Sequence, residues 1–386
     1  MPKLSVADLD LSGRLVLTRV DFNVPMHQGV ITDDSRITAT LPTLRYLREH
    51  GARTVLCSHL GRPKGKIDLK YTLRPVAEHL ERVLDANVGF CPETVGPLAN
   101  EMASKLEPGG VMLVENLRFQ AGEEANDEGF SRQLAELGDV YVNDAFGAAH
   151  RAHASTAGVT RFFTEAAAGF LMLRELDYLG RVLAAKEHPF VVILGGAKAS
   201  DKLPLISHLA RTADHLLIGG GMAYTFLRAQ GKPIGDSLVQ DDFVPAAGDL
   251  LKQAKHGQIL LPTDHVLEEG TVVHEIPAHG KAMDIGPATR AAFARAIAPA
   301  RIVFWNGPMG VFERPPLDAG TLAVARAVAG CPGVTVAGGG DSVAALRASG
   351  LEDKLTHVST GGGASLEFLA GDTLPGVAAL TEAPSA

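Results

Sequence analysis

The sequence is poor in cysteine and has no long apolar run. Its three cysteines, Cys57, Cys91 and Cys331, lie far apart and form no CxxC pair. A disulfide framework is therefore excluded, and reduced thiols are expected, as in a cytoplasmic protein. No apolar run is long enough to span a bilayer, and residues 1–8 lack the basic start and apolar stretch of a secretory leader. We expect a cytoplasmic protein with no membrane partner.

An excess of positive charge is also missing. The net charge is −8 and 21% of the residues are charged, which argues against a protein that coats nucleic acid with its whole surface. Any anion site must therefore be a local basic patch. The 46% of apolar residues makes disorder implausible, and 386 residues exceed what one hydrophobic core usually serves. Two domains are expected.

Short β-branched runs alternate with helical patterns along the whole chain, which is typical of βαβ units and a parallel sheet. Glycines or polar residues follow nearly every run. The first half predicts strands at 15–20, 54–59, 88–91, 111–115 and 140–143. The second half predicts strands at 190–194, 215–218, 258–261, 301–305, 334–337 and 357–359. The fold class is α/β.

Two helices follow from the pattern of apolar residues. The first spans Ser35–Glu49, with Asp34 as a plausible N-cap and Gly51 as a stop. Its apolar face consists of Ile37, Leu41, Leu44 and Leu47. The second is a continuous helix over 164–183 that contains no proline and joins the two halves. No soft linker is present, so two domains hinged on this helix are expected.

Cations follow the strands of the first half, where ligands bind in open α/β sheets. The polar runs after these strands are 21–23, 59–62, 115–118 and 150–153. Arginine suits phosphate and carboxylate because its fork donates paired hydrogen bonds. Each arginine alone is more simply explained by a local carboxylate partner, but four near strand ends favour convergence on one anion. These four are Arg36, Arg62, Arg118 and Arg151.

The histidines of this half have simpler explanations than a metal. His59 is compatible with a core histidine. The pair His150 and His153 would need further ligands, and Arg151 between them would repel a cation. The segment His274–His279 has one residue too many, and a proline, for a zinc-protease helix. A strand and turn is the better prediction there.

The strands of the second half are followed by glycines instead. The clusters are 195–196, 219–221, 338–340 and 361–363. One cluster often marks only a tight turn, but four at strand ends favour loops whose N–H groups cradle phosphates. None matches G-x-G-x-x-G or the P-loop G-x-x-x-x-G-K-[ST], which disfavours a dehydrogenase and a P-loop kinase.

Four charged residues accompany the glycine loops. Lys198 and Lys202 would share a face near a phosphate if their segment is helical, or are ordinary solvated lysines. Asp341 could hold Mg²⁺ through one carboxylate, the usual arrangement for a metal carried by nucleotide phosphates, or could be a helix N-cap. Glu313 could accept hydrogen bonds from ribose hydroxyls, or simply lie at the surface.

Together these motifs resemble the phosphoglycerate kinase family over nearly the whole chain. The six segments that carry the resemblance are VDFNVP at 20–25, SHLGRP at 58–63, AHRAH at 149–153, LGGAK at 194–198, WNGPMG at 305–310 and GGGD at 338–341. Each is modest alone, but their order and presence in both halves make the joint match specific. Small departures are Ser342, where many relatives carry threonine, and Ala199, where a bulkier residue is common.

The resemblance implies reversible, Mg²⁺-dependent transfer of the acyl phosphate of 1,3-bisphosphoglycerate to ADP, giving 3-phosphoglycerate and ATP. It implies a monomer with two doubly wound, Rossmann-like domains joined by an interdomain helix. The expected boundaries are 1–165 for the phosphoglycerate domain, 166–184 for the hinge helix and 185–370 for the nucleotide domain. The tail, about 371–386, is expected to pack back on the first domain.

Site residues are carried over from the family motifs. Phosphoglycerate would be held by Asp21, Phe22, Asn23, Arg36, His59, Leu60, Gly61, Arg62, Arg118, His150 and Arg151. The nucleotide would be held by Gly195, Gly196, Lys198, Lys202, Gly219, Gly220, Asn306, Pro308, Val311, Glu313, Gly339, Gly340, Asp341 and Ser342, with Asp341 on the metal. Arg36, Lys198, Lys202, Gly362 and Gly363 would act on the transferring phosphoryl group.

Two alternatives remain open. Another sugar-acid or acyl-phosphate kinase could use similar glycine loops, and a panel of phosphoryl acceptors would distinguish it. A non-catalytic anion-binding protein would leave Lys198, Lys202 and Asp341 without a joint purpose, and it predicts no turnover with Mg-ATP.

Overall fold

The structure is a computed structural model that describes residues 2–200, 202–255 and 257–384. The chain forms two compact units, one running to Asp177 and resumed from Thr373, the other spanning Tyr178–Asp372. The division falls inside helix α6 (Phe170–Ala184). Within the described residues, no helix is long and apolar enough to cross a membrane.

Unit 1 is built on a six-stranded parallel sheet of order β5-β6-β4-β1-β7-β8. Its strands are β1 (Leu15–Arg19), β4 (Arg53–Cys57), β5 (Val88–Cys91), β6 (Val111–Val114), β7 (Val140–Asn143) and β8 (Ala166–Ala168). Its helices are α1 (Ser35–Glu49), α2 (Arg74–Leu84), α3 (Pro97–Ser104), α4 (Ala121–Glu124), α5 (Glu128–Ala135) and α14 (Pro375–Ala378), and β2 (Met26–His27) pairs with β3 (Val30–Ile31) in a hairpin.

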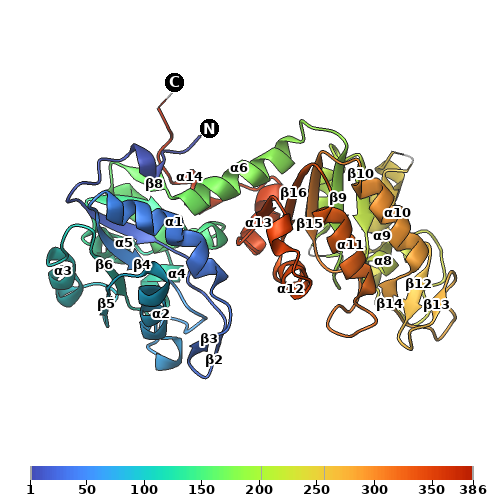
Figure 1. Cartoon of the computed structure of the whole chain (residues 1–386), viewed down its shortest axis with the longest axis horizontal. Helices are drawn as coiled ribbons and strands as arrows, with labels where there is room; N and C mark the ends of the chain where they lie inside the picture. The colour runs from blue at the N-terminus through green and yellow to red at the C-terminus, as the bar shows by residue number, and fades with distance from the viewer. Residues whose placement is uncertain (1, 201, 256, 385–386) are drawn as a thin grey trace. The chain divides into compact units, whose positions relative to one another are not determined.

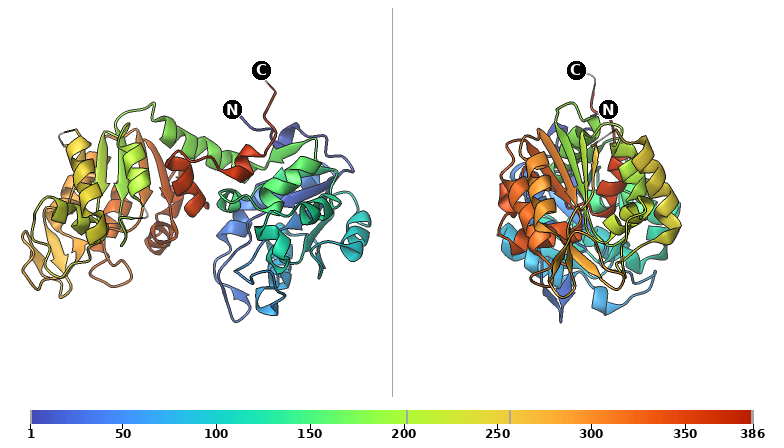
Figure 2. Two further views of the ribbon diagram at one scale, coloured as in Figure 1. Left: turned by 180° about the vertical axis from the view of Figure 1, so that it is seen from behind. Right: turned by 90° about the vertical axis from the view of Figure 1, so that its right-hand side faces the viewer.

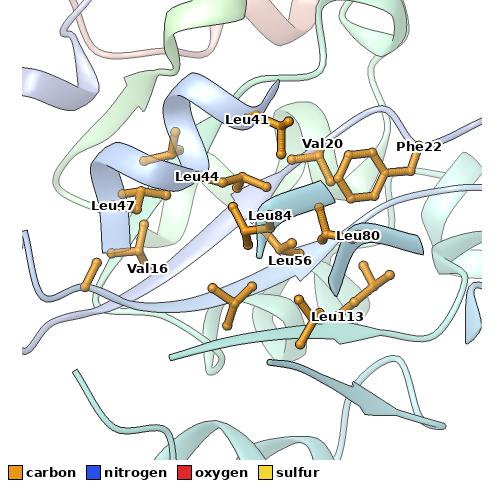
Figure 3. Packing of buried hydrophobic residues seen from close by; sticks show 14 of the residues in the cluster. Val16, Val20, Phe22, Leu41, Leu44, Leu47, Leu56, Leu80, Leu84 and Leu113 are labelled. Carbon is orange, nitrogen blue, oxygen red and sulfur yellow. The ribbon is translucent and has the colours of Figure 1, made fainter. Parts of the chain in front are cut away.

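The core of unit 1 lies between this sheet and helices α1 and α2. Figure 3 shows the apolar face of α1 pointing at side chains of the strands, and Leu80 and Leu84 of α2 beside them. The four residues predicted for the inner face of α1 are all buried, which confirms that prediction. Burying a leucine side chain contributes about 2 kcal/mol, so this face fixes the helix on the sheet.

Unit 2 repeats the plan with a parallel sheet of order β11-β10-β9-β15-β16-β17. Its strands are β9 (Phe190–Leu194), β10 (His215–Ile218), β11 (Ile259–Leu260), β15 (Ile302–Asn306), β16 (Val334–Gly338) and β17 (His357–Val358), with a small antiparallel sheet of β12 (His265–Leu267), β13 (Val272–Val273) and β14 (Ala282–Ile285). Its helices are α7 (Leu203–Leu209), α8 (Met222–Ala229), α9 (Val244–Gln253), α10 (Pro287–Ile297), α11 (Ala319–Ala329), α12 (Gly340–Ala348) and α13 (Gly363–Leu369).

Helices cover both faces of the second sheet. Figure 1 shows α10 and α11 on one face, and the view from behind in Figure 2 shows the yellow-green helices α8 and α9 on the other. The two doubly wound parallel sheets confirm the predicted α/β fold class. All eleven predicted strands are present with ends within one residue of the prediction, apart from 54–59, which ends two residues earlier at Cys57.

One local prediction was wrong. Residues 166–168 form β8 beside β7, so the continuous helix predicted over 164–183 begins only at Phe170. Asp34 is the N-cap residue of α1, as predicted, although its side chain makes no capping hydrogen bond and its Oδ2 instead lies 2.9 Å from Nε2 of His79. The Oδ1 of Asp33 accepts a hydrogen bond at 2.9 Å from the N–H of Ser35, the first residue of the helix.

The C-terminal segment belongs to unit 1 by contact. The N–H of Leu4 donates to the carbonyl of Thr381 at 2.9 Å, and the N–H of Gly376 donates to the carbonyl of Ala149 at 2.8 Å. The second bond ties α14 to the loop after β7, which also carries His150 and Arg151.

Candidate active site

Both sheets reverse their winding at a defined point. In unit 1 the chain runs from β1 to β4 on one side and later places β7 on the other side of β1. In unit 2 it runs from β9 to β10 and later places β15 on the other side of β9. Ligands of open α/β sheets bind beyond the carboxyl ends of strands at such switch points. The two groups of predicted site residues lie at these two places.

In unit 1, Arg36 is held over the end of β1. Its Nη1 lies 3.2 Å from Oδ2 of Asp21 and donates to the carbonyl of Asn23 at 3.1 Å. The side-chain Oδ1 of Asn23 in turn accepts from the N–H of Gly61 at 2.9 Å, which ties the loop after β1 to the loop after β4. The side chain of Arg36 is 30% exposed, so it can also reach a ligand.

Arg118 reaches the same loop from the end of β6. It is only 4% exposed, and its Nη1 donates to the carbonyl of Gly61 at 2.7 Å. Its Nε lies 3.1 Å from a carboxylate oxygen of Glu124. Burial lowers the pKa of Arg118, Glu124 raises it, and the charge of Arg151 lowers it further. The repulsion between Arg118 and Arg151 favours binding of an anion at this place.

The loop after β7 completes the cluster. Nε of Arg151 donates to Nε2 of His150 at 3.1 Å, so this histidine is neutral with that nitrogen as an acceptor. Burial, with Arg118 and Arg19 nearby, lowers the pKa of His153 to about 4. Burial and then Arg19 lower the pKa of His59 well below its ordinary value. Neutral histidines among arginines suit hydrogen bonding to an anion. Among the described residues, no three His, Cys, Asp or Glu side chains form a metal cluster.

The other residues predicted for the unit 1 site differ in their exposure to solvent. Arg62 is exposed beyond Gly61. Phe22 and Leu60 belong to the hydrophobic core, at 0% and 4% exposed, so only their backbone groups could contact a ligand. The N–H of Phe22 already donates to Oγ of Ser58 at 2.9 Å. The side chains of these two residues therefore shape the site without lining it.

Unit 2 contains a cavity of about 430 Å³ at the switch point between β9 and β15. Its lining combines backbone of glycine loops with two lysines and one carboxylate. The lining residues are Gly196, Ala197, Lys198, Lys202, Asn306, Gly307, Gly339, Gly340, Asp341, Ser342, Gly362, Gly363 and Leu366. Four different strand ends contribute to it.

Lys202 is positioned by the two central strands of that sheet. Its Nζ donates to the carbonyl of Gly195, after β9, and to the carbonyl of Asn306, at the end of β15, the second at 3.1 Å. Neither lysine lies inside a helix: Lys198 lies in a loop, and Lys202 is the N-cap residue of α7. The helix-face argument for these lysines was therefore wrong, although both line the cavity.

The glycines of the loops fall into two kinds. A Cβ on Gly220 would lie 2.5 Å from the nitrogen of Gly196, and one on Gly195 would overlap the carbonyl of Pro308. A Cβ on Gly219 would lie 2.5 Å from Sδ of Met309. These three glycines let two loops pack together and do not form an open phosphate cradle. By contrast, nothing lies within 4 Å of a Cβ on Gly340, Gly362 or Gly363, and these residues line the cavity.

Helix α12 points its N-terminus into the cavity. Its N-cap is Gly339, at φ +95°, and no side chain caps the first turn. The free N–H groups of a nine-residue helix there favour an anion. Asp341 is exposed inside the first turn, so it is not the N-cap. Ser342 is fully buried and its Oγ accepts from the N–H of Gly307 at 2.5 Å, which orients the backbone more than it offers a ligand group.

Three predicted nucleotide residues follow β15 but lie outside the lining of this cavity. Pro308 is buried, Glu313 is exposed, and the N–H of Val311 donates to the carbonyl of Met283 at 3.0 Å. Asp284 packs closely against this loop, since a Cβ added to Gly310 would lie 2.4 Å from Oδ1 of Asp284. Burial raises the pKa of Asp284 to about 6.

Sequence reasoning missed the buried charges beneath both sites. Arg19 and Glu123 are fully buried in unit 1, and Asp284 is 1% exposed in unit 2. Arg19 could have been noticed as a charge inside a run that is otherwise a buried strand. Glu123 and Asp284 carry no such signal, because each is an ordinary acidic residue in a polar or mixed segment.

Comparison with known proteins decides the family. A family model described as phosphoglycerate kinase matches residues 6–372. The chain belongs to the phosphoglycerate kinase family. The enzyme of this name from Solibacter usitatus is 55% identical, with 98% of this chain and 100% of that protein covered. The one from Koribacter versatilis is 54% identical, with 99% and 100% covered. A solved phosphoglycerate kinase from Coxiella burnetii is 40% identical, covers 98% of both chains and has a TM-score of 0.90.

The function of the family follows from this membership. Phosphoglycerate kinases are phosphotransferases with a carboxyl group as acceptor, and they catalyse a reversible step of glycolysis. The chain therefore catalyses transfer of the acyl phosphate of 1,3-bisphosphoglycerate to ADP, giving 3-phosphoglycerate and ATP.

Proposed function

We propose that unit 1 binds phosphoglycerate, that unit 2 binds the nucleotide, and that the phosphoryl group passes directly between them. The observation that carries this allocation is the chemistry of the two switch points. Unit 1 presents arginines and neutral histidines, which suit a small acid with a phosphate at one end. Unit 2 presents open glycines, lysines and a helix N-terminus, which suit a chain of phosphates.

In unit 1, Arg118, Arg151 and Arg62 bind the non-reacting phosphate and hold the acid in place. Asp21 and Asn23 have acceptor atoms for a hydroxyl group while they also hold Arg36. Arg36 donates to the reacting carboxyl or its phosphoryl group, with Lys198, Lys202, Gly362 and Gly363 acting from the nucleotide side. The loose transition state spreads charge over three oxygens, so positioned donors do most of the catalysis.

The cavity of unit 2 fits Mg²⁺ that arrives with the nucleotide. Asp341 supplies one exposed carboxylate beside the open glycines, and one carboxylate is enough when phosphates and water provide the other ligands. When bound, the ion would neutralise charge on the phosphates. Glu313 binds the ribose, and Pro308 and Val311 with Gly219 and Gly220 border the adenosine.

Two reactants held by separate units must meet for direct transfer. We therefore propose that the units close together, hinged within 166–184, and that closure excludes water from the acyl phosphate. Small-angle scattering should show compaction only when 3-phosphoglycerate and the nucleotide are both bound. An unchanged radius of gyration at saturation with both would contradict closure.

Direct transfer is tested by stereochemistry. ATP made chiral at the γ-phosphorus with oxygen isotopes should give 1,3-bisphosphoglycerate with inverted configuration, as one in-line displacement requires. Net retention would indicate two displacements and a phosphorylated enzyme.

We further propose that the enzyme acts as a cytoplasmic monomer without nucleic-acid or membrane partners. Equilibrium sedimentation of the purified protein would test the oligomeric state.

A further inference from the structure

Arg19 lies directly beneath the predicted phosphoglycerate site and is fully buried within β1. Each part of its guanidinium has a partner. Nε donates to Oγ of Ser155 at 2.8 Å, Nη1 donates to the carbonyl of Val20, and Nη2 lies 3.1 Å from Nδ1 of His59. A buried arginine with every side occupied is held in one orientation, so its contact with His59 is fixed by the fold.

A buried carboxylate, that of Glu123, interacts electrostatically with Arg19 and is joined to it through Ser155. Glu123 is also fully buried, and its two oxygens accept from Oγ of Ser155 at 2.6 Å and from the N–H of Ser155 at 3.0 Å. Ser155 belongs to a π-helical turn, Ala154–Gly158, a rare conformation that often marks functional sites. Because its hydroxyl hydrogen goes to Glu123, Ser155 can only accept from Arg19. Arg19 is therefore the donor in both contacts, to Ser155 on one side and to His59 on the other.

The contact with His59 determines where the imidazole proton lies. A guanidinium has no acceptor atom and stays protonated, so Nδ1 of His59 must supply the lone pair. The neutral ring then carries its proton on Nε2. The carboxylate of Asp21 does not compete, because its Oδ1 is 3.9 Å from Nδ1, beyond hydrogen-bond range. The surrounding cations Arg36 and Arg118, together with His153, also oppose protonation of the ring.

We infer that Arg19 is a positioning residue that fixes His59 as the Nε2–H tautomer, so that its Nε2–H is the donor offered to an oxygen of phosphoglycerate. This inference rests on the proposed function of unit 1. Arg19 touches no substrate itself and acts through His59. Without it, the ring could flip, exchange tautomers or take up a proton.

The tautomer is measured on the wild-type protein without substrate. Long-range proton–nitrogen correlation spectra of ¹⁵N-histidine-labelled protein at pH 7, with His59 assigned through His59→Gln, should show Nδ1 unprotonated and Nε2 protonated. A ring with Nδ1–H, a mixture of tautomers or an imidazolium would overturn the inference. This result does not depend on turnover. If instead the proposed function is wrong, the wild-type protein should show the predicted tautomer but no binding of 3-phosphoglycerate.

Variants test the role of Arg19. Arg19→Gln removes the obligate donor, and Arg19→Gln with Glu123→Gln removes both buried charges, which protects against misfolding from an unpaired carboxylate. Both should give mixed His59 tautomers and weaken 3-phosphoglycerate binding by about ten- to a hundredfold, the effect of losing a hydrogen bond to a charged group. Mg-ATP binding should not change. Arg53→Gln, in the neighbouring strand β4, is the matched control. A folded variant that keeps the tautomer and the affinity would contradict the inference.

Discussion

The proposed role of Arg36 predicts a large fall in kcat when the side chain is removed. Arg36→Ala deletes a cation whose Nη1 lies 3.2 Å from Asp21 and 3.1 Å from the carbonyl of Asn23, and which we propose donates to the reacting group. Loss of one preorganised charged donor costs about 3 kcal/mol in the transition state, or roughly a hundredfold in rate.

Stability should change far less. The side chain of Arg36 is 30% exposed, so solvent screens its pair with Asp21, and the loss should be about 1 kcal/mol. That corresponds to a fall in Tm of about 2–4 °C for a unit of this size. The variant should therefore be folded under assay conditions, and its kinetic defect can be attributed to chemistry.

The assay compares kcat and KM for both substrates in wild type, Arg36→Ala and Arg36→Lys. Arg45→Ala is the control, since Arg45 is exposed on the same helix. Arg36→Ala should lower kcat with the KM for ATP unchanged, Arg36→Lys should be intermediate because it keeps the charge but loses the fork, and Arg45→Ala should match wild type. An Arg36→Ala enzyme with normal kcat would remove Arg36 from the mechanism.

Four further outcomes are expected. Lys202→Ala should lower kcat by about a hundredfold, whereas Lys252→Ala, an exposed lysine of the same unit, should have no effect in the same assay. Gly220→Ala should lower Tm because its Cβ would meet backbone, while Gly340→Ala should leave Tm unchanged and raise the KM for ATP; the reverse pattern would refute the division of the glycines. The folded-state pKa of Asp284 is about 6, above its usual 3.8, so the folded state binds the proton more tightly and stability from this group falls as pH rises through that range. On lowering the pH from 7 to 4, the free energy of unfolding of wild type, measured with urea, should therefore rise by on the order of 2–3 kcal/mol relative to that of Asp284→Asn. A difference between the two proteins that does not change with pH would contradict the raised pKa. Removing Mg²⁺ with EDTA should abolish turnover without changing the circular dichroism, because the ion is expected to arrive with the nucleotide.

Much of the parallel sheet architecture could be predicted, because β-branched runs bounded by polar or glycine residues are a local signal. The strands Val88–Cys91 and Val140–Asn143 have the predicted bounds. The strand Ala166–Ala168 could not be found this way, since alanine is the strongest helix former. Its pairing with Tyr141–Asn143 of β7 is a tertiary contact that overrides the local preference.

The sequence predicted which residues form the candidate site, but not which of them contact one another. Sequence spacing placed Arg36, Arg118 and Arg151 near strand ends, because those positions follow from the fold. It could not show that Gly220 packs against backbone while Gly340 faces open space, since both are glycines after strands. Nor could it show that Arg19 contacts His59, because this depends on side-chain direction across two paired strands.

The most direct test of the account is a coupled assay of the purified protein with Mg-ATP and 3-phosphoglycerate, in which a dehydrogenase and NADH report 1,3-bisphosphoglycerate. Glycerate without phosphate is the control. The account predicts turnover that requires the phosphorylated acid, ATP and Mg²⁺ together. Folded protein that shows no turnover, or equal turnover with glycerate, would contradict it.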